Sequence, residues 1–321
     1  MARKKVAIIG AGNVGATAAC YMALEDICDV ALVDIPQTGG MPKGKSLDMM
    51  QAGAIYGYSS KIVGGTDYDI VAGSDVVVIT AGIPRKPGMD RMDLLKTNAG
   101  IVSNVTDKVL AAAPDAIIIV VSNPLDVMTY LCWKQSKKPR EKVVGMAGAL
   151  DCARFGTFIA MELGCSVNDV RAMVVGGHGD VTMVPVPRLS TVWGIPLPAL
   201  LPQDKIDALV TRGMNGGKEI VNLLGTGSAY YAPAAGIVSM CRAMILDEKR
   251  LIPTCVRLQG EYGHADGVFV GVPTVLGANG LERIIEIKLE GKERELFDKS
   301  ADSVRKGMKE IDELLAATAA K

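Results

Sequence analysis

Three glycines close to the start of the chain have the spacing of a turn that binds phosphate groups. The run Gly10-Ala-Gly-Asn-Val-Gly15 follows an apolar segment at 6–10 and opens a segment with helical spacing. Glycine allows a tight turn and a close approach of the backbone to a pyrophosphate, whose charge is stabilised by the free amide hydrogens of a helix N-terminus. We therefore expect a dinucleotide to bind here, through Gly10, Gly12, Asn13, Val14 and Gly15.

An acidic residue at the end of the next apolar run indicates which dinucleotide binds. Asp34 closes the segment 30–34 and stands 19 positions beyond Gly15. A carboxylate there accepts hydrogen bonds from a ribose diol and repels a 2′-phosphate, so the sequence favours NAD over NADP. The alternative, a purely structural turn followed by a strand-end acid, is disfavoured by the complete strand–turn–helix context.

One of the two histidines lies in a glycine-rich turn. His178 stands in Gly176-Gly-His-Gly-Asp180 directly after an apolar segment, where small neighbours leave space around the imidazole. An imidazole can take up and return a proton near neutral pH, as the oxidation of an alcohol by hydride transfer requires. A histidine in an isolated glycine turn is more often structural, so this assignment depends on further motifs. The other histidine, His264, is expected at the surface.

Together with further motifs, these residues resemble the lactate/malate dehydrogenase family. The further motifs are Leu150-Asp-Cys-Ala-Arg-Phe155, Ser122-Asn-Pro124 and Ala81-Gly-Ile-Pro-Arg-Lys-Pro-Gly-Met-Asp-Arg91. They occur in the family's order over nearly the whole chain, and they look most like the malate dehydrogenases whose overall sequence is lactate-dehydrogenase-like. The resemblance implies an NAD-dependent oxidoreductase acting on malate and oxaloacetate, in the tricarboxylic acid cycle.

The resemblance also implies catalytic roles. His178 matches the family's proton acceptor and donor, and Asp151 matches the carboxylate that binds the other ring nitrogen. Arg154 matches the residue that holds the substrate α-carboxylate, for which a planar guanidinium is well suited. Asp151 and Arg154 are three positions apart, so on a helix both side chains face one site.

Two arginines lie in the segment 82–93, which its prolines and glycines prevent from forming a regular helix. We expect this segment to close over the substrate and exclude water. Arg91 matches the family's arginine that polarises the carbonyl being reduced. Arg85 stands where lactate dehydrogenases typically have glutamine, so it would pair with the second carboxylate of malate or oxaloacetate, and pyruvate would leave this cation unpaired.

Asn123 matches an asparagine that binds the substrate oxygen near the nicotinamide, although it could also be a structural strand-end residue beside Pro124. Residues 225–229 are expected near the substrate. The cofactor channel is expected to be lined by Thr80, Ala81, Gly82, Asn98, Val121 and Asn123.

The segments that must position these residues alternate in the first half between apolar runs and helical spacing. Strands are predicted at 6–10, 30–34, 75–82, 116–123 and 143–147, and helices at 14–24, 43–54 and 94–113. This α/β order predicts a Rossmann doubly wound parallel sheet, in an NAD-binding domain that spans residues 1–147.

The second half, residues 148–321, is expected to be an α+β substrate and catalytic domain. Helices are predicted at 151–163, 203–224, 233–246 and 291–320, a strand at 170–175, and antiparallel strands at 254–256 and 268–272. The last helix carries charges of both signs, which suits a solvated face.

Composition excludes several classes of protein. The 321 residues include 35 basic and 35 acidic ones, and this balance argues against a nucleic-acid partner. No apolar run approaches the roughly 20 residues of a membrane helix. The basic first residues lead straight into an apolar strand without a cleavage site, so we expect no signal peptide. Seven cysteines without a CxxC pair indicate reduced thiols, no metal site and a cytoplasmic location. A homodimer or homotetramer is expected from the resemblance.

Three alternatives stay open. The nearest is a lactate dehydrogenase or a broader 2-hydroxyacid dehydrogenase. A second is a non-catalytic NAD-binding module, against which the set of His178, Asp151, Arg154 and Arg91 argues. A third, an NAD- and metal-dependent hydrolase, lacks a histidine and cysteine ligand cluster.

Overall fold

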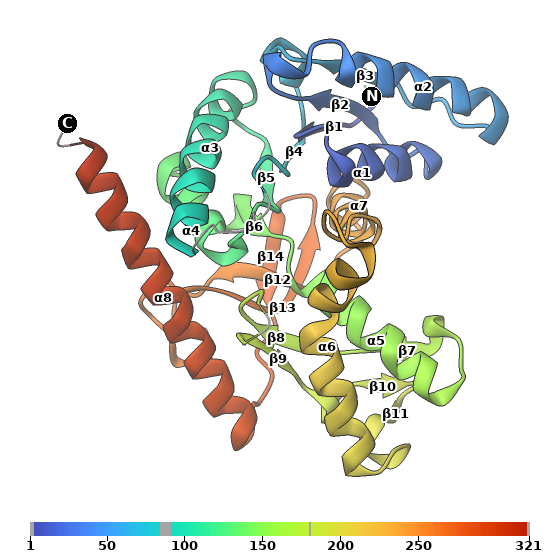
Figure 1. Cartoon of the computed structure of the whole chain (residues 1–321), viewed down its shortest axis with the longest axis vertical. Helices are drawn as coiled ribbons and strands as arrows, with labels where there is room; N and C mark the ends of the chain where they lie inside the picture. Colours follow the sequence, from blue (N-terminus) through green and yellow to red (C-terminus); the bar gives the residue numbers. More distant parts are fainter. Residues whose placement is uncertain (1–2, 84–90, 180, 320–321) are drawn as a thin grey trace.

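The computed structural model describes residues 3–83, 91–179 and 181–319 (Figure 1). The strands of the first half are β1 (Lys5–Ile9), β2 (Asp29–Val33), β3 (Ile62–Gly65), β4 (Val76–Ile79), β5 (Ile117–Val120) and β6 (Val143–Gly145). They are parallel and lie in the order β3-β2-β1-β4-β5-β6. This is the doubly wound Rossmann sheet that the sequence predicts.

Helices cover both faces of this sheet. Alternate side chains of each strand therefore enter two different cores, one on each face. In β1, Val6 and Ile8 pack in one core with helices α1 (Asn13–Leu24) and α7 (Tyr231–Ile245) (Figure 1). Ala7 and Ile9 pack in the other core, with α3 (Arg91–Ala112), α4 (Leu125–Ser136) and α8 (Lys292–Ala319). Side chains alternate along a strand, so a strand buried on both faces is apolar throughout. The helices of the first half are α1 (Asn13–Leu24), α2 (Met41–Tyr56), α3 (Arg91–Ala112) and α4 (Leu125–Ser136).

The second half combines antiparallel strands with long helices. Its strands are β7 (Val170–Arg171), β8 (Val174–Gly176), β9 (Met183–Pro185), β10 (Thr191–Val192), β11 (Ile195–Pro196), β12 (Arg250–Arg257), β13 (Phe269–Gly277) and β14 (Gly280–Ile284). Its helices are α5 (Gly148–Leu163), α6 (Gln203–Leu224), α7 (Tyr231–Ile245) and α8 (Lys292–Ala319). The predicted α+β character of this half is confirmed.

The two halves share one sheet. β12 pairs with β6 through Cys255 and Gly145, and the sheet continues through β13 to β8 and β9. A Cβ atom on Gly145 would lie 2.5 Å from Oγ1 of Thr129 and 3.0 Å from Cβ of Cys255, so only glycine permits this close approach. The antiparallel strands β12, β13, β14, β8 and β9 are therefore an extension of the Rossmann sheet.

The predicted strand at 170–175 is wrong in one respect, since it is two strands in different sheets. β7 belongs to a three-stranded sheet with β10 and β11, whereas β8 belongs to the large sheet. Met173, between them, binds Oγ of Ser190 with its backbone N–H. The elements β3, α4, β9, β10, β11 and β14 were not predicted, because they are short or have no clear apolar period.

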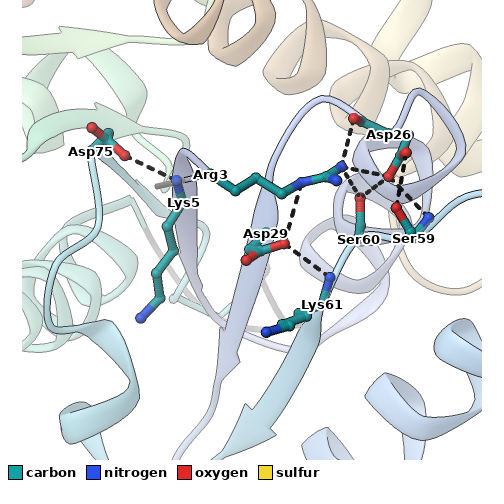
Figure 2. A network of polar contacts seen from close by, with 8 residues as sticks. All are labelled: Arg3, Lys5, Asp26, Asp29, Ser59, Ser60, Lys61 and Asp75. Atoms are coloured by element: carbon teal, nitrogen blue, oxygen red, sulfur yellow. Dashed lines mark hydrogen bonds and ion pairs between the residues drawn. The ribbon is translucent and has the colours of Figure 1, made fainter. Parts of the chain in front are cut away.

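Charged side chains connect the amino ends of the parallel strands, at the edge opposite the glycine turn (Figure 2). Arg3 binds Asp26, Asp29 and Ser60, the backbone N–H of Lys61 donates to Asp29, and that of Lys5 donates to Asp75. Because most of these groups are partly exposed, each contributes modestly to stability. The network fixes one edge of the sheet and leaves the carboxyl edge for a site.

Candidate active site

The glycine turn has the shape that a pyrophosphate requires. Gly10 has a φ of +114°, and a Cβ on it would lie 2.5 Å from Oγ1 of Thr80; a Cβ on Gly15 would lie 1.9 Å from the Gly10 carbonyl oxygen. Around Gly12, by contrast, no atom lies within 4 Å of such a Cβ. Two glycines are thus required by packing, while the third leaves open space at the N-terminus of α1, which begins at Asn13 and has no acidic residue in its first turn.

Asp34 lies directly beside this turn. Its Oδ2 accepts a hydrogen bond of 2.7 Å from the backbone N–H of Ala11, and its Oδ1 accepts one of 2.8 Å from that of Ile35. Nζ of Lys45, on α2, donates to the Ala11 carbonyl oxygen at 2.7 Å. The carboxylate is therefore held at the carboxyl end of β2, next to the open space at Gly12.

Asn98 connects the ends of β4 and β5. The Asn98 amide donates to the carbonyl oxygens of Ile83 and Asn123 at 3.1 and 2.7 Å and accepts from the Ile83 N–H at 2.9 Å. Asn98 is buried, so its amide mainly orients the backbone of the strand ends, and its contact with a cofactor stays a prediction. Asn123 is exposed at this edge, and its peptide bond to Pro124 is cis. Thr80, Ala81 and Val121 are partly exposed beside it, and Gly82 is exposed.

His178 and Asp151 lie together, as predicted. Nδ1 of His178 is 2.9 Å from Oδ2 of Asp151, whose side chain is 3% exposed, while that of His178 is 15% exposed. Asp151 lies in the first turn of α5, and one turn later Arg154 places Nη1 3.7 Å from Oδ1 of Asp151. Two elements, the turn after β8 and the helix α5, thus bring together an imidazole, a carboxylate and a guanidinium.

The environment of His178 favours its protonated form. Burial lowers the pKa of the imidazole, but the charge and hydrogen bond of Asp151 and the charge of Asp126 outweigh burial, so the pKa is raised above its ordinary value. The charge of Arg154 opposes this rise. Such an imidazole can hold a proton and release it near neutral pH.

Glycines of α6 allow it to pack against α5 beside Arg154. A Cβ on Gly213 would be 3.2 Å from Phe155, one on Gly216 3.3 Å from Phe158, and one on Gly217 3.4 Å from Nη1 of Arg154. This packing role of the run Gly213-Met-Asn-Gly-Gly217 was not predicted, although three glycines inside one helix are a signal for it. Residues 225–229, expected near the substrate, follow α6; residues 225–228 are exposed and Ala229 is partly exposed.

Some predicted residues lie outside the described parts of the chain. Arg85 is outside the described residues, as are Asp180 and most of the segment 82–93. Arg91 begins α3, but its side chain is not among those described.

The prediction of a surface position for His264 is wrong. His264 is only 9% exposed, its Nδ1 is 2.8 Å from Nη2 of Arg305, and its ring lies 5.8 Å from that of Phe297. The polar residues around His264 in the sequence turn outward, while helix α8 covers the imidazole itself.

Two models of one protein family match the chain. The lactate/malate dehydrogenase NAD binding domain matches residues 4–145, and the alpha/beta C-terminal domain matches residues 148–315. The chain belongs to the lactate/malate dehydrogenase family. The predictions of an oxidoreductase with an NAD-binding Rossmann domain are thereby confirmed.

Relatives in this family are similar over their full length. The malate dehydrogenase of Bacillus pumilus is 53% identical over 307 residues, which cover 96% of this chain and 98% of the relative. The apo structure of Picrophilus torridus malate dehydrogenase has a TM-score of 0.94 and 42% identity, and the match covers 99% of this chain and 100% of that one.

A lactate dehydrogenase is similar too. The Cryptosporidium parvum enzyme, complexed with lactic acid and nicotinamide adenine dinucleotide, has a TM-score of 0.92 and 41% identity over 97% of this chain and 99% of its own. The shared fold alone therefore does not distinguish a malate from a lactate dehydrogenase. In the described part of the chain, no helix has both the length and the apolar character to span a membrane.

Proposed function

We propose that this protein is an NAD-dependent malate dehydrogenase, which oxidises (S)-malate reversibly to oxaloacetate. The observation that carries the proposal is the group of His178, Asp151 and Arg154, in which Nδ1 of His178 is 2.9 Å from the carboxylate and the guanidinium lies 3.7 Å from the same carboxylate. A base, its orienting acid and a carboxylate-binding cation are the groups that a 2-hydroxy acid requires. The names of the 53% identical relatives support malate as the substrate.

The residues at the carboxyl edge of the sheet fit NAD. Gly10 and Gly15 cannot carry a Cβ, and Gly12 leaves space for the pyrophosphate. Asp34, held beside the turn, would bind the adenosine ribose. When bound, NAD supplies the nicotinamide that accepts or returns the hydride at C2 of the substrate.

His178 accepts and returns the proton in this proposal. If Nδ1–H donates to Asp151, Nε2 is the nitrogen that can accept the proton of the malate hydroxyl. Asp151 then stabilises the imidazolium, and in the reverse direction the imidazolium returns the proton to the oxygen of oxaloacetate. Asn123, exposed at the same edge, would bind that oxygen.

Three arginines divide the recognition of the substrate in this proposal. Arg154 binds the α-carboxylate, and Arg91 polarises the reacting carbonyl, where electrostatic stabilisation contributes most. Arg85 pairs with the distal carboxylate and so selects a dicarboxylate. Closure of the segment 82–93 would bring the last two to the substrate.

The test compares oxidation of NADH with oxaloacetate and with pyruvate at matched concentrations, with NADPH as the cofactor control. A strong preference for oxaloacetate and NADH supports the roles of Arg85 and Asp34. A preference for pyruvate selects the second candidate, a lactate dehydrogenase, which the similarity to the C. parvum enzyme favours. NADH binding without turnover of either oxoacid would instead indicate a non-catalytic module.

We also propose a homodimer or homotetramer in the cytoplasm, with the domains dividing at residues 147 and 148. Helix α2 supports assembly, because Leu47, Met50 and Ile55 on it are 54%, 42% and 85% exposed. Light scattering of the purified protein tests the oligomeric state, and a monomeric mass at working concentration would contradict the proposed assembly.

A further inference from the structure

A second carboxylate lies behind His178 and is not part of the acid–base pair described above. Asp126, in the first turn of α4, is 6% exposed, and its Oδ2 accepts a hydrogen bond of 2.8 Å from the backbone N–H of His178. Asp151 thus binds the ring of His178, while Asp126 binds its backbone. The two acids come from different helices and meet at one residue.

The local sequence is built to admit this carboxylate. A Cβ on Gly177 would lie only 3.2 Å from Oδ2 of Asp126, so a larger residue before His178 would crowd the carboxylate. The backbone N–H of Gly177 donates to Oγ of Ser300, on α8, at 2.7 Å. Two successive amides of the turn are therefore held by two side chains, of which one is charged and one is neutral.

A hydrogen bond to the backbone alone does not explain a charged residue at this place. The neutral hydroxyl of Ser300 accepts the hydrogen bond of the Gly177 N–H, and the amide oxygen of an asparagine would accept that of the His178 N–H. The other oxygen of Asp126, Oδ1, is buried and has no partner with hydrogen-bond geometry among the described residues, and besides the His178 N–H the carboxylate is approached only by the thiol of Cys255, a weak donor, so the buried charge is costly. Burial also raises the pKa of Asp126, which the His178 N–H partly opposes.

The negative charge of Asp126 acts on the imidazole of His178. The charged groups that face the imidazole in the described part of the chain are Asp151 and Arg154 from α5 and Asp126 from α4. Arg154 disfavours the imidazolium, whereas both carboxylates favour it. We propose that Asp126 is a positioning residue, which fixes His178 through its backbone amide and adds a second negative charge that stabilises the imidazolium.

This inference rests on the proposed function, so its test includes a readout that needs no turnover. The chain has only two histidines, and a His264→Asn variant assigns their NMR signals. Asp126→Asn keeps the acceptor for the backbone N–H and removes the charge. We expect a lower imidazole pKa for His178 in Asp126→Asn than in the wild type, with NADH affinity unchanged.

A lower imidazole pKa moves the pH limbs of both directions to lower pH, so it slows oxaloacetate reduction and favours malate oxidation. Oxaloacetate reduction needs the imidazolium, so in Asp126→Asn its alkaline limb moves to lower pH and kcat above pH 7 falls on the order of tenfold. Malate oxidation needs the neutral imidazole, so its acid limb moves to lower pH as well. Ser300→Ala, the matched control without a change of charge, is expected to lower stability and leave both limbs in place.

An unchanged imidazole pKa and unmoved limbs in Asp126→Asn would overturn the proposal. If that variant does not fold, the carbon-13 signal of the Asp126 carboxyl in the wild type decides, because a protonated Asp126 at neutral pH would equally overturn it. Absence of turnover in the wild type would refute the proposed function, whereas the NMR titration would still decide the role of Asp126.

Discussion

Nδ1 of His178 lies 2.9 Å from Oδ2 of Asp151, and the carboxylate that it meets is almost fully buried. A buried carboxylate at hydrogen-bond distance fixes both the tautomer and the orientation of an imidazole. The nitrogen left for the substrate is then Nε2. The chemistry proposed for this protein depends on that relationship.

Asp151→Asn is expected to lower kcat for malate oxidation on the order of a hundredfold or more, because the imidazolium loses its counter-charge and the tautomer is no longer fixed. NADH affinity, measured by fluorescence titration, should stay close to that of the wild type. Unchanged turnover would remove Asp151 from the mechanism.

Arg85→Gln is expected to shift the ratio of kcat/KM from oxaloacetate toward pyruvate, on the order of tenfold or more, because the distal carboxylate loses its partner. The matched control is Arg250→Gln, at an exposed arginine of β12, which should leave the ratio unchanged. If both variants keep the wild-type preference, Arg85 does not read the substrate.

The pH dependence follows from the raised pKa of His178. Malate oxidation needs the neutral imidazole, so its kcat/KM should rise with pH through a value above the ordinary histidine pKa. The kcat/KM of oxaloacetate reduction, which needs the protonated imidazole, should fall with pH over the same range. A midpoint below the ordinary value in the free enzyme would contradict the charge arrangement at this site.

Two glycines of the turn are expected to differ in their tolerance of alanine. Gly15→Ala forces a Cβ within 1.9 Å of the Gly10 carbonyl oxygen, so we expect a loss of about 1–3 kcal/mol or more in the free energy of unfolding. Gly12→Ala meets no neighbouring atom and should fold normally while weakening NADH binding. Thermal unfolding and fluorescence titration separate the two, and equal Tm losses would refute the division of roles.

The sequence by itself determined the elements whose residues repeat with a clear period. The buried runs that became β1, β2, β4, β5 and β6 are apolar on both faces, and the predicted helix at 203–224 coincides with α6. The glycine turn and Asp34 were also predictable, because a backbone that turns tightly after a strand needs glycine at set positions.

Only the tertiary structure decided which residues meet. Asp126 and the backbone of His178 are 52 positions apart, and Ser300 and Gly177 are 123 apart. Nothing in the local pattern of α4 or α8 indicates these contacts, because they depend on how the helices pack against the sheet. The same holds for His264, whose polar neighbours suggested the surface, and for Gly145, whose missing side chain lets β12 join the parallel sheet. Periodicity reports short-range structure, whereas the site is formed by long-range packing.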